Sequence, residues 1–264
     1  MVTALRCATS ALRKYRHPQH IETTRLTTNH RPSGNHIQTV ATNLPPPFGL
    51  ESTTNLAEPT GWAIISDIDD TIKITQTTSP LGILHNTFCV ENPLPVQGMP
   101  ELYANLKTKL DNPPFLYLSA SPYNLYPFLR SFRSAHFPPG PLILRDASWQ
   151  NLGGLISSLS QGTQEYKSAR IAKIHSWLPQ RKVILIGDST QSDPEAYGAC
   201  ARDFPGWVGA IFIRKVTGIA GMDEEAKNGD GRFEKAFEGV ERGVWSVFED
   251  PKEVAEGVER LVGR

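Results

Sequence analysis

The sequence predicts an α/β fold, in which helices cover both faces of a central parallel sheet. Apolar runs of four to six residues alternate along the chain with stretches of helical periodicity. The runs are continuously apolar, as is typical of strands that are buried on both faces. Polar residues follow several runs directly, at the strand ends where parallel sheets form their binding sites.

The predicted elements follow in a regular order from about residue 60. Five apolar runs are predicted strands: residues 62–66, 115–118, 141–144, 183–186 and 208–213. Helices are predicted over residues 99–110, 122–132, 165–178, 194–202 and 251–262. The last helix begins at Asp250 and Pro251, a capping residue followed by the residue preferred at the first helical position.

The charge distribution divides the chain into two regions. Basic and acidic side chains number 27 each, but residues 1–50 carry six basic groups and one acid, a balance of +5, which leaves −5 for the remainder. Few apolar residues and no periodicity predict that residues 1–58 form a disordered basic leader and linker. Residues 59–264 are the predicted folded domain. An Arg-rich, acid-poor leader is also typical of a mitochondrial transit peptide.

Composition excludes several classes of protein. A net charge of zero argues against a nucleic-acid binder that depends on general attraction to phosphates. The longest uncharged apolar runs stop after about six residues, whereas a membrane-spanning helix needs about 20. The three cysteines form no CxxC pair, so neither a disulfide framework nor a zinc site is predicted. A reduced, cytoplasmic location follows from this cysteine usage.

Residues suited to phosphate chemistry follow three of the predicted strands. Because the carboxyl ends of parallel strands meet at one edge of a sheet, these residues are expected to converge. They are Asp67 and Asp69 after the first strand, Ser119 after the second, and Asp188 and Asp193 after the fourth, with Lys167 near the start of the preceding helix.

Four carboxylates at one edge cannot all stay ionised without a cation, because like charges raise each other's pKa. Oxygen ligands favour Mg²⁺, so we expect a magnesium site formed by Asp67, Asp69, Asp188 and Asp193. A lysine and a hydroxyl beside the cation would suit a phosphate dianion. Of the two carboxylates in Asp-x-Asp, one can attack phosphorus while the other transfers a proton. The pattern therefore predicts phosphoryl transfer.

This arrangement resembles the haloacid dehalogenase-like phosphatases. Their DxDxT signature matches at Asp67, Asp69 and Thr71, and their strand-terminal Ser/Thr, lysine and GDxxxxD elements match Ser119, Lys167 and the Asp188–Asp193 segment. Five segments are similar in sequence to the actin-patch phosphatidate phosphatase family of fungi and its bacterial relatives: residues 66–73, 95–103, 117–126, 187–195 and 213–217. The resemblance covers roughly residues 60–217.

The resemblance implies a Rossmann-like three-layer sandwich with a small cap insertion, and Mg²⁺-dependent hydrolysis of phosphatidate to diacylglycerol and phosphate. It implies that Asp67 forms an aspartyl-phosphate and that Asp69 acts as the acid and base. Ser119 and Lys167 would hold the phosphoryl oxygens. The metal ligands would be the Asp67 side chain, the Asp69 backbone carbonyl and Asp188, with Asp193 in support.

The resemblance also implies peripheral contact with membranes that contain phosphatidate, and actin-patch or endocytic proteins as partners. The expected location is cytoplasmic, at a membrane or a cortical actin patch. Since the folded domain is acidic, recruitment to anionic lipid is expected to depend on Lys73, Arg130, Arg133 or the basic leader.

Alternatives remain at several positions. Asp70 and Glu195 suit structural roles as well as supporting ones, and Lys173 is a less well-placed competitor of Lys167. The short insertion over residues 74–93 leaves a site open to bulky substrates, which includes phosphoproteins as well as lipids. Two other functions are therefore considered: a phosphatase of the same fold that acts on phosphoproteins or small esters, and a non-catalytic adaptor at cortical actin or membranes.

Overall fold

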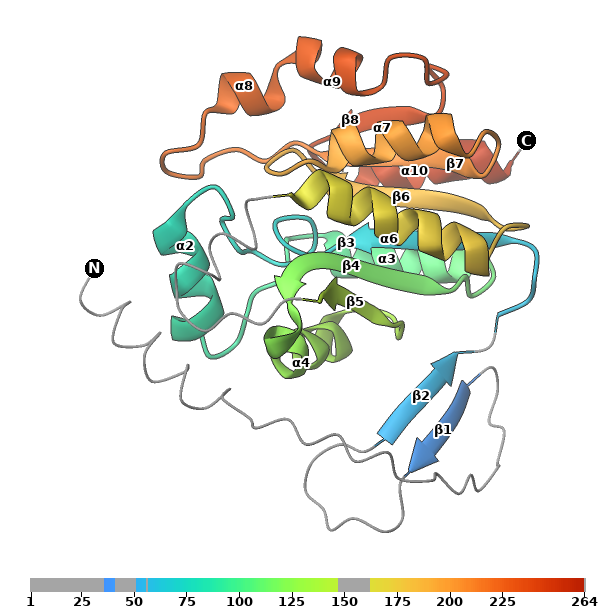
Figure 1. The fold of residues 1–264 in the computed structure, drawn as a ribbon, viewed down its shortest axis with the longest axis horizontal. Helices are drawn as coiled ribbons and strands as arrows, with labels where there is room; N and C mark the ends of the chain where they lie inside the picture. The colour runs from blue at the N-terminus through green and yellow to red at the C-terminus, as the bar shows by residue number, and fades with distance from the viewer. Residues whose placement is uncertain (1–35, 41–50, 56, 147–161, 264) are drawn as a thin grey trace.

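The computed structural model describes residues 36–40, 51–55, 57–146 and 162–263 of the chain, and its centre is a six-stranded parallel sheet (Figure 1). The strand order is β5-β4-β3-β6-β7-β8, and every neighbouring pair is parallel. The strands are β3 (Trp62–Asp67), β4 (Phe115–Pro122), β5 (Leu142–Arg145), β6 (Lys182–Asp188), β7 (Val208–Arg214) and β8 (Trp245–Phe248). This confirms the predicted α/β class and the parallel sheet.

Helices cover both faces of the sheet, which makes three layers (Figure 1). One face packs against α3 (Met99–Lys109), α4 (Tyr126–His136) and α10 (Pro251–Val262). The other face packs against α6 (Thr163–Trp177), α7 (Asp193–Asp203) and α9 (Asp230–Ala236). Successive strand side chains alternate between these two cores: Ile64 faces the first, and Ala63 and Ile65 face the second.

Most predicted elements match the observed ones to within a few residues. The cap on the last helix is confirmed: Asp250 accepts a 2.9 Å hydrogen bond from the Lys252 N–H, and the Glu253 side chain accepts the Asp250 N–H at 2.8 Å. Three observed elements were not predicted from the sequence: α8 (Glu224–Asn228), α9 and β8. These elements have four to seven residues each, too few to show a clear period.

The cap insertion after β3 is small. It contains α2 (Pro80–Leu84) and a π-helical turn (His85–Cys89), and a short 3₁₀ turn (Tyr123–Leu125) joins β4 to α4. Ser79 caps α2 by accepting a 3.1 Å hydrogen bond from the Gly82 N–H. The insertion lies at the carboxyl edge of the sheet, beside the tips of β3 and β4 (Figure 1).

Within the predicted leader, β1 (His36–Val40) pairs with β2 (Glu51–Asn55) in antiparallel register. The composition did not indicate this hairpin. The rest of the leader up to residue 56, with its six basic residues and five prolines, lies outside the described residues, so the domain boundaries remain a prediction.

The strand order places a topological switch point between β3 and β6. The chain runs from β3 outward to β4 and β5 on one side, then returns to continue with β6, β7 and β8 on the other. Ligands of open α/β sheets bind outside the carboxyl ends of the strands at such a switch point. The carboxyl tips of β3 and β6 are Asp67 and Asp188.

Candidate active site

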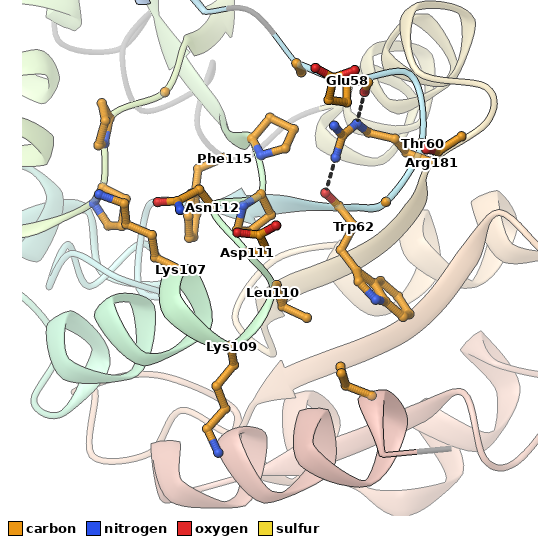
Figure 2. Close-up of a pocket in the computed structure, with 18 of the residues that line it drawn as sticks. Glu58, Thr60, Trp62, Lys107, Lys109, Leu110, Asp111, Asn112, Phe115 and Arg181 are labelled. Atoms are coloured by element: carbon orange, nitrogen blue, oxygen red, sulfur yellow. Dashed lines mark hydrogen bonds between the residues drawn. The ribbon is translucent and has the colours of Figure 1, made fainter. Parts of the chain in front are cut away.

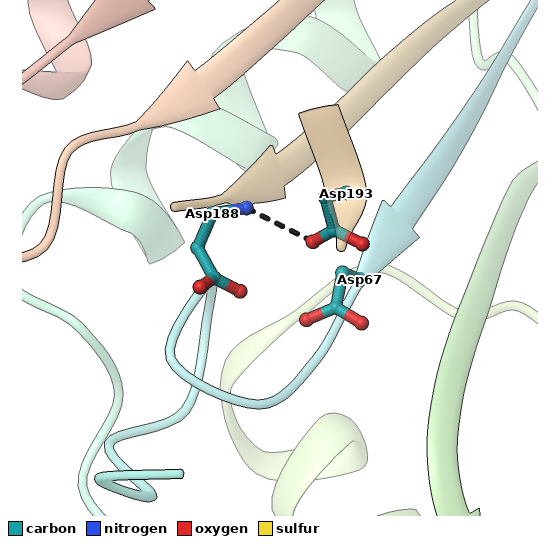
Figure 3. Close-up of side chains that lie close together, drawn as sticks. All are labelled: Asp67, Asp188 and Asp193. Carbon is teal, nitrogen blue, oxygen red and sulfur yellow. Dashed lines mark hydrogen bonds between the residues drawn. The ribbon is translucent and has the colours of Figure 1, made fainter. Parts of the chain in front are cut away.

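Three of the predicted carboxylates converge at the switch point. Asp67 ends β3, Asp188 ends β6 and Asp193 begins α7, and one oxygen from each lies within 4.8 Å of the others (Figure 3). Each side chain is at most 1% exposed. The sequence analysis expected this convergence, because residues from separate strand tips meet at one edge.

The segment after β6 holds Asp193 in place. Its carboxylate accepts a 3.0 Å hydrogen bond from the Asp188 N–H (Figure 3). A Cβ on Gly187 would lie 2.5 Å from Asp193 Oδ2 and 2.7 Å from its Cβ, closer than real side chains approach. Only glycine at residue 187 therefore lets the start of α7 come this close to the strand tip.

Lys167 is the cation within this cluster. It extends from α6, is fully buried, lies 2.7 Å from Asp67 Oδ1 and pairs directly with Asp193. Burial alone would lower its pKa, but the carboxylates of Asp193 and Asp67 outweigh burial and raise the pKa above its usual value. Lys167 therefore stays charged. Its predicted competitor Lys173 is exposed on the same helix and lies over the Trp177 ring.

One lysine does not balance three buried carboxylates. Burial raises the pKa of Asp67 well above its usual range; Lys167 opposes this, and Asp193 and Asp188 add to it. Burial and then Asp193 raise the pKa of Asp188 to about 6, although Lys167 and hydrogen bonds from Thr190 lower it. The single positive charge of Lys167 is thus too little to keep all three carboxylates ionised.

The neutral hydrogen-bond donors in the cluster, such as Thr190 and Thr71, add no net positive charge. The Thr71 hydroxyl lies 3.2 Å from Asp67 Oδ2 and 3.1 Å from Asp188 Oδ2, but its single proton can serve only one of them well. A divalent cation held by oxygen ligands would supply the missing charge, so the residues fit a site for Mg²⁺ or a similar hard ion. Asp67, Asp188 and Asp193 are the side chains that would hold it.

Asp69 has a different environment. Its carboxylate is not among the three that converge. It accepts hydrogen bonds from the hydroxyls of Ser119 at 2.6 Å, Ser121 at 3.1 Å and Thr75 at 2.8 Å. The expected metal contact of Asp69 through its backbone carbonyl remains a prediction. Ser119 thus lies at the site, where its hydroxyl donates to Asp69.

Asp70 anchors the start of the cap insertion. It adopts a left-handed backbone conformation, with φ of 62°, and its carboxylate accepts hydrogen bonds from the backbone N–H groups of Thr75, Gln76 and Thr77. Burial raises the pKa of Asp70, and Asp188 adds to the increase, while the bonds from Thr77 oppose it. Its role here is to hold the loop over residues 75–77.

Lys73, which we expected to help in lipid recruitment, is 1% exposed and donates to the Thr75 hydroxyl at 2.9 Å. That expectation is wrong for Lys73, because its ammonium is directed inward. Burial also lowers its pKa.

Arg232 is a residue that sequence reasoning missed. Its guanidinium donates to the carbonyls of Ser189 (2.5 Å) and Gln191 in the loop after β6, and to both carboxylate oxygens of Glu195 at 2.8 and 3.0 Å. It thereby ties α9 to the loop between Asp188 and Asp193. No local motif marks such a residue, since its partners lie about 40 positions earlier in the chain.

A large cavity among the described residues lies elsewhere. It has a volume of about 780 Å³ and is lined by Trp62, Phe115, Arg181, Lys107 and residues 109–114, at the amino edge of the sheet (Figure 2). Arg181 closes one wall by donating to the Glu58 carbonyl at 2.7 Å and the Trp62 carbonyl at 2.6 Å. None of Asp67, Asp188 and Asp193 lines this cavity, so its size does not make it the candidate active site.

Comparison with known proteins identifies the family. The catalytic-domain family described as "Phosphatidate phosphatase APP1, catalytic domain" matches residues 62–215, more than half of the chain. The chain belongs to this family. The match includes every predicted site residue, and α8 to α10 follow it.

Two fungal proteins are also similar to this chain. The chain is 35% identical over 180 residues to "Phosphatidate phosphatase APP1" of Saccharomyces cerevisiae, an alignment that covers 66% of this chain and 30% of the yeast protein. It is 28% identical over 158 residues to an uncharacterized protein of Schizosaccharomyces pombe, which covers 59% of this chain and 25% of that protein. The chain thus spans less than a third of the length of either relative.

Proposed function

We propose that this chain is a Mg²⁺-dependent phosphatidate phosphatase that works through an aspartyl-phosphate on Asp67. The observation that carries the proposal is the buried cluster of Asp67, Asp188, Asp193 and Lys167 at the switch point of the sheet. Membership of the APP1 catalytic-domain family supports phosphatidate as the substrate, because the yeast relative is named for that activity.

The residues divide the reaction between them. An Asp67 carboxylate oxygen bonds to phosphorus, the bond from phosphorus to the glycerol oxygen breaks, and a proton on Asp69 passes to that oxygen. Water then attacks the phosphoryl group, Asp69 takes its proton, and phosphate leaves with Asp67 restored. A bound Mg²⁺ would neutralise charge on the phosphoryl oxygens.

Lys167 and Ser119 complete the site. The Lys167 ammonium lies 2.7 Å from Asp67, where it can hold a phosphoryl oxygen next to the nucleophile. Ser119 donates to Asp69 at 2.6 Å. In the reaction, the Ser119 hydroxyl would move its hydrogen bond from Asp69 to a phosphoryl oxygen. Asp69 would then be free for proton transfer.

The decisive experiment measures phosphate release from phosphatidate in mixed micelles, with Mg²⁺ and with a chelator. We expect turnover only with Mg²⁺ and none from Asp67→Asn. The matched control is Asp203→Asn, an exposed carboxylate at the far end of α7. Retained turnover in folded Asp67→Asn would refute the nucleophile, and faster release from small phosphate esters than from phosphatidate would refute the substrate.

The cytoplasmic location, at a membrane or a cortical actin patch, is part of the same proposal, with mitochondrial import by the leader as the alternative. Among the described residues, no helix combines the length and apolar character needed to cross a bilayer. Deleting residues 1–50 is expected to weaken binding to acidic vesicles and to spare turnover of a soluble phosphate ester. Equal vesicle binding by both chains would contradict a role for the basic leader.

A further inference from the structure

Exposed apolar side chains gather at the edge of the sheet where the carboxylates lie. The described part of the chain has six large apolar side chains that are clearly exposed. Four of them are Ile74, Leu81, Leu94 and Tyr126, which are 38, 52, 62 and 44% exposed. We call these four residues the apolar rim.

The topology of the chain places the rim around the site. Ile74 and Leu81 belong to the cap insertion, which leaves the carboxyl tip of β3, and Leu94 follows directly after the insertion. Tyr126 begins α4 just after the tip of β4 (Figure 1). The other two exposed apolar residues, Trp177 and Val262, lie at the ends of α6 and α10, which run back to the amino edge.

Contacts link the parts of the rim. The Ile74 N–H donates to the Leu94 carbonyl at 3.1 Å. Gln76 lies against Gly82 in α2, next to Leu81. The Lys73 ammonium lies 5.4 Å from the centre of the Phe128 ring, which joins the insertion to the first turn of α4.

The charge pattern of the rim favours a lipid surface. Residues 74–94 contain one charged side chain, Glu91, in a chain that is 20% charged. Little charge would therefore lose its hydration if this segment entered a membrane interface. Arg130 lies one turn after Tyr126 on α4, on the same side of the helix, where a cation would meet anionic headgroups.

The depth of the site requires close contact between the rim and a membrane that contains the substrate. Asp67, Lys167 and Asp188 are at most 1% exposed, so a phosphate must pass inward to reach them. A lipid that bears this phosphate keeps its acyl chains in the bilayer. The protein must then bring its carboxyl edge into contact with the membrane.

We propose that the apolar rim inserts into the surface of a lipid bilayer and holds the site over an anionic phospholipid. This inference rests on the proposed phosphatidate phosphatase function for its choice of partner. Leu81 and Leu94 are the main anchors because they are the most exposed, and Tyr126 suits the interface between headgroups and acyl chains.

The test compares two matched double variants of the full chain. Leu81→Ser with Leu94→Ser removes apolar surface from the rim, and Trp177→Ser with Val262→Ser removes it from the opposite edge. Sedimentation with phosphatidylcholine vesicles, with and without phosphatidate, measures binding. The vesicles without phosphatidate have no net charge, so they do not attract the basic leader. We expect the rim variant to bind roughly ten- to thirtyfold more weakly, and the control to bind as the wild type does.

Activity toward a soluble, short-chain phosphatidate separates this inference from the proposed function. The rim variant should keep that activity while it loses turnover of phosphatidate in vesicles. If the variant loses vesicle binding but the wild type hydrolyses no phosphatidate at all, the membrane-binding role of the rim is supported and the proposed function is refuted. Thermal melting shows that loss of binding by the rim variant is not loss of folding. A separate Tyr126→Ser variant repeats the binding test at another residue of the rim.

Three results would overturn the proposal. The first is equal vesicle binding by the rim variant and the wild type. The second is an equal loss in the control variant, which would show that any exposed apolar residue has the same effect. The third is a wild-type dimer that the rim variant dissociates, because a second copy of the chain would then cover this surface.

Discussion

Replacing Lys167 with methionine removes the cation from the buried carboxylate cluster and keeps most of the side-chain volume. Lys167 pairs with Asp67 at 2.7 Å and with Asp193, and all three side chains are at most 1% exposed. Loss of one partner leaves the other charges buried and unpaired. Breaking a buried pair in this way costs about 3–5 kcal/mol of folding free energy.

The corresponding change in melting temperature is measurable. A domain of this size loses about 2–4 °C for each kcal/mol, so Lys167→Met should melt on the order of 10 °C below the wild type in a chelator. Mg²⁺ should narrow this gap, because a divalent cation neutralises the same carboxylates and binds only the folded state. Phosphatase activity should be lost in both conditions, because in the proposed mechanism the Lys167 ammonium also holds the phosphoryl group.

Differential scanning calorimetry with and without Mg²⁺ measures both effects. Lys173→Met is the matched control, since it makes the same substitution at an exposed position of the same helix. That variant should melt within about 2 °C of the wild type, because surface substitutions change the folding free energy by at most about 0.5 kcal/mol. A Lys167→Met protein that melts with the wild type in a chelator, or a gap that Mg²⁺ leaves unchanged, would refute the charge-balance argument.

Three further predictions concern the metal site. Gly187→Ala places a Cβ 2.5 Å from Asp193 Oδ2, so it should cost about 1–3 kcal/mol and abolish the Mg²⁺-dependent rise in melting temperature; an unchanged rise would contradict this. The gain in melting temperature from Mg²⁺ should grow as the pH rises from about 4 to 6. In the metal-free protein the pKa of Asp188 is raised from 3.8 to about 6. The protonated Asp188 carboxyl therefore stabilises the folded state below pH 4, and this contribution is lost as the pH rises past 6. Mg²⁺ binds the ionised form, so the contribution of the metal increases over the same range. A gain that is flat with pH would show that this carboxylate is not a ligand. Arg232→Met should weaken Mg²⁺ binding by about 10- to 100-fold by calorimetry, whereas Arg202→Met, which loses bonds to carbonyls at the end of α9, should not.

The main features of the site were predictable because of a geometric rule. In a parallel sheet every strand delivers its carboxyl end to the same edge, so polar residues that follow separate apolar runs must converge. Asp67 and Asp188 are 121 positions apart but end neighbouring strands. Lys167 was predictable for the same reason, since a helix that follows a strand begins at that edge.

Other features depended on contacts that no local pattern encodes. Arg232 reaches the loop after β6 from α9, a seven-residue helix with no sequence signal of its own. Lys73 follows the DxDxT segment and resembles a surface lysine, yet the loop that Asp70 holds turns it inward. Both outcomes are fixed by how distant or tightly turned segments pack, which a single sequence does not show.

The separation of Asp67 from Asp69 is the feature on which the proposed chemistry depends. The two carboxylates are two residues apart, but β3 ends at Asp67 and the chain then turns, so their surroundings differ. Asp67 lies among charges, next to a lysine and two other carboxylates, whereas Asp69 lies among the hydroxyls of Ser119, Ser121 and Thr75. A charged cluster suits an ionised nucleophile, and hydroxyl partners can reorient to follow a carboxyl group that gains and loses a proton. The turn after β3 therefore gives two identical side chains different surroundings, which supports the two different roles proposed for them.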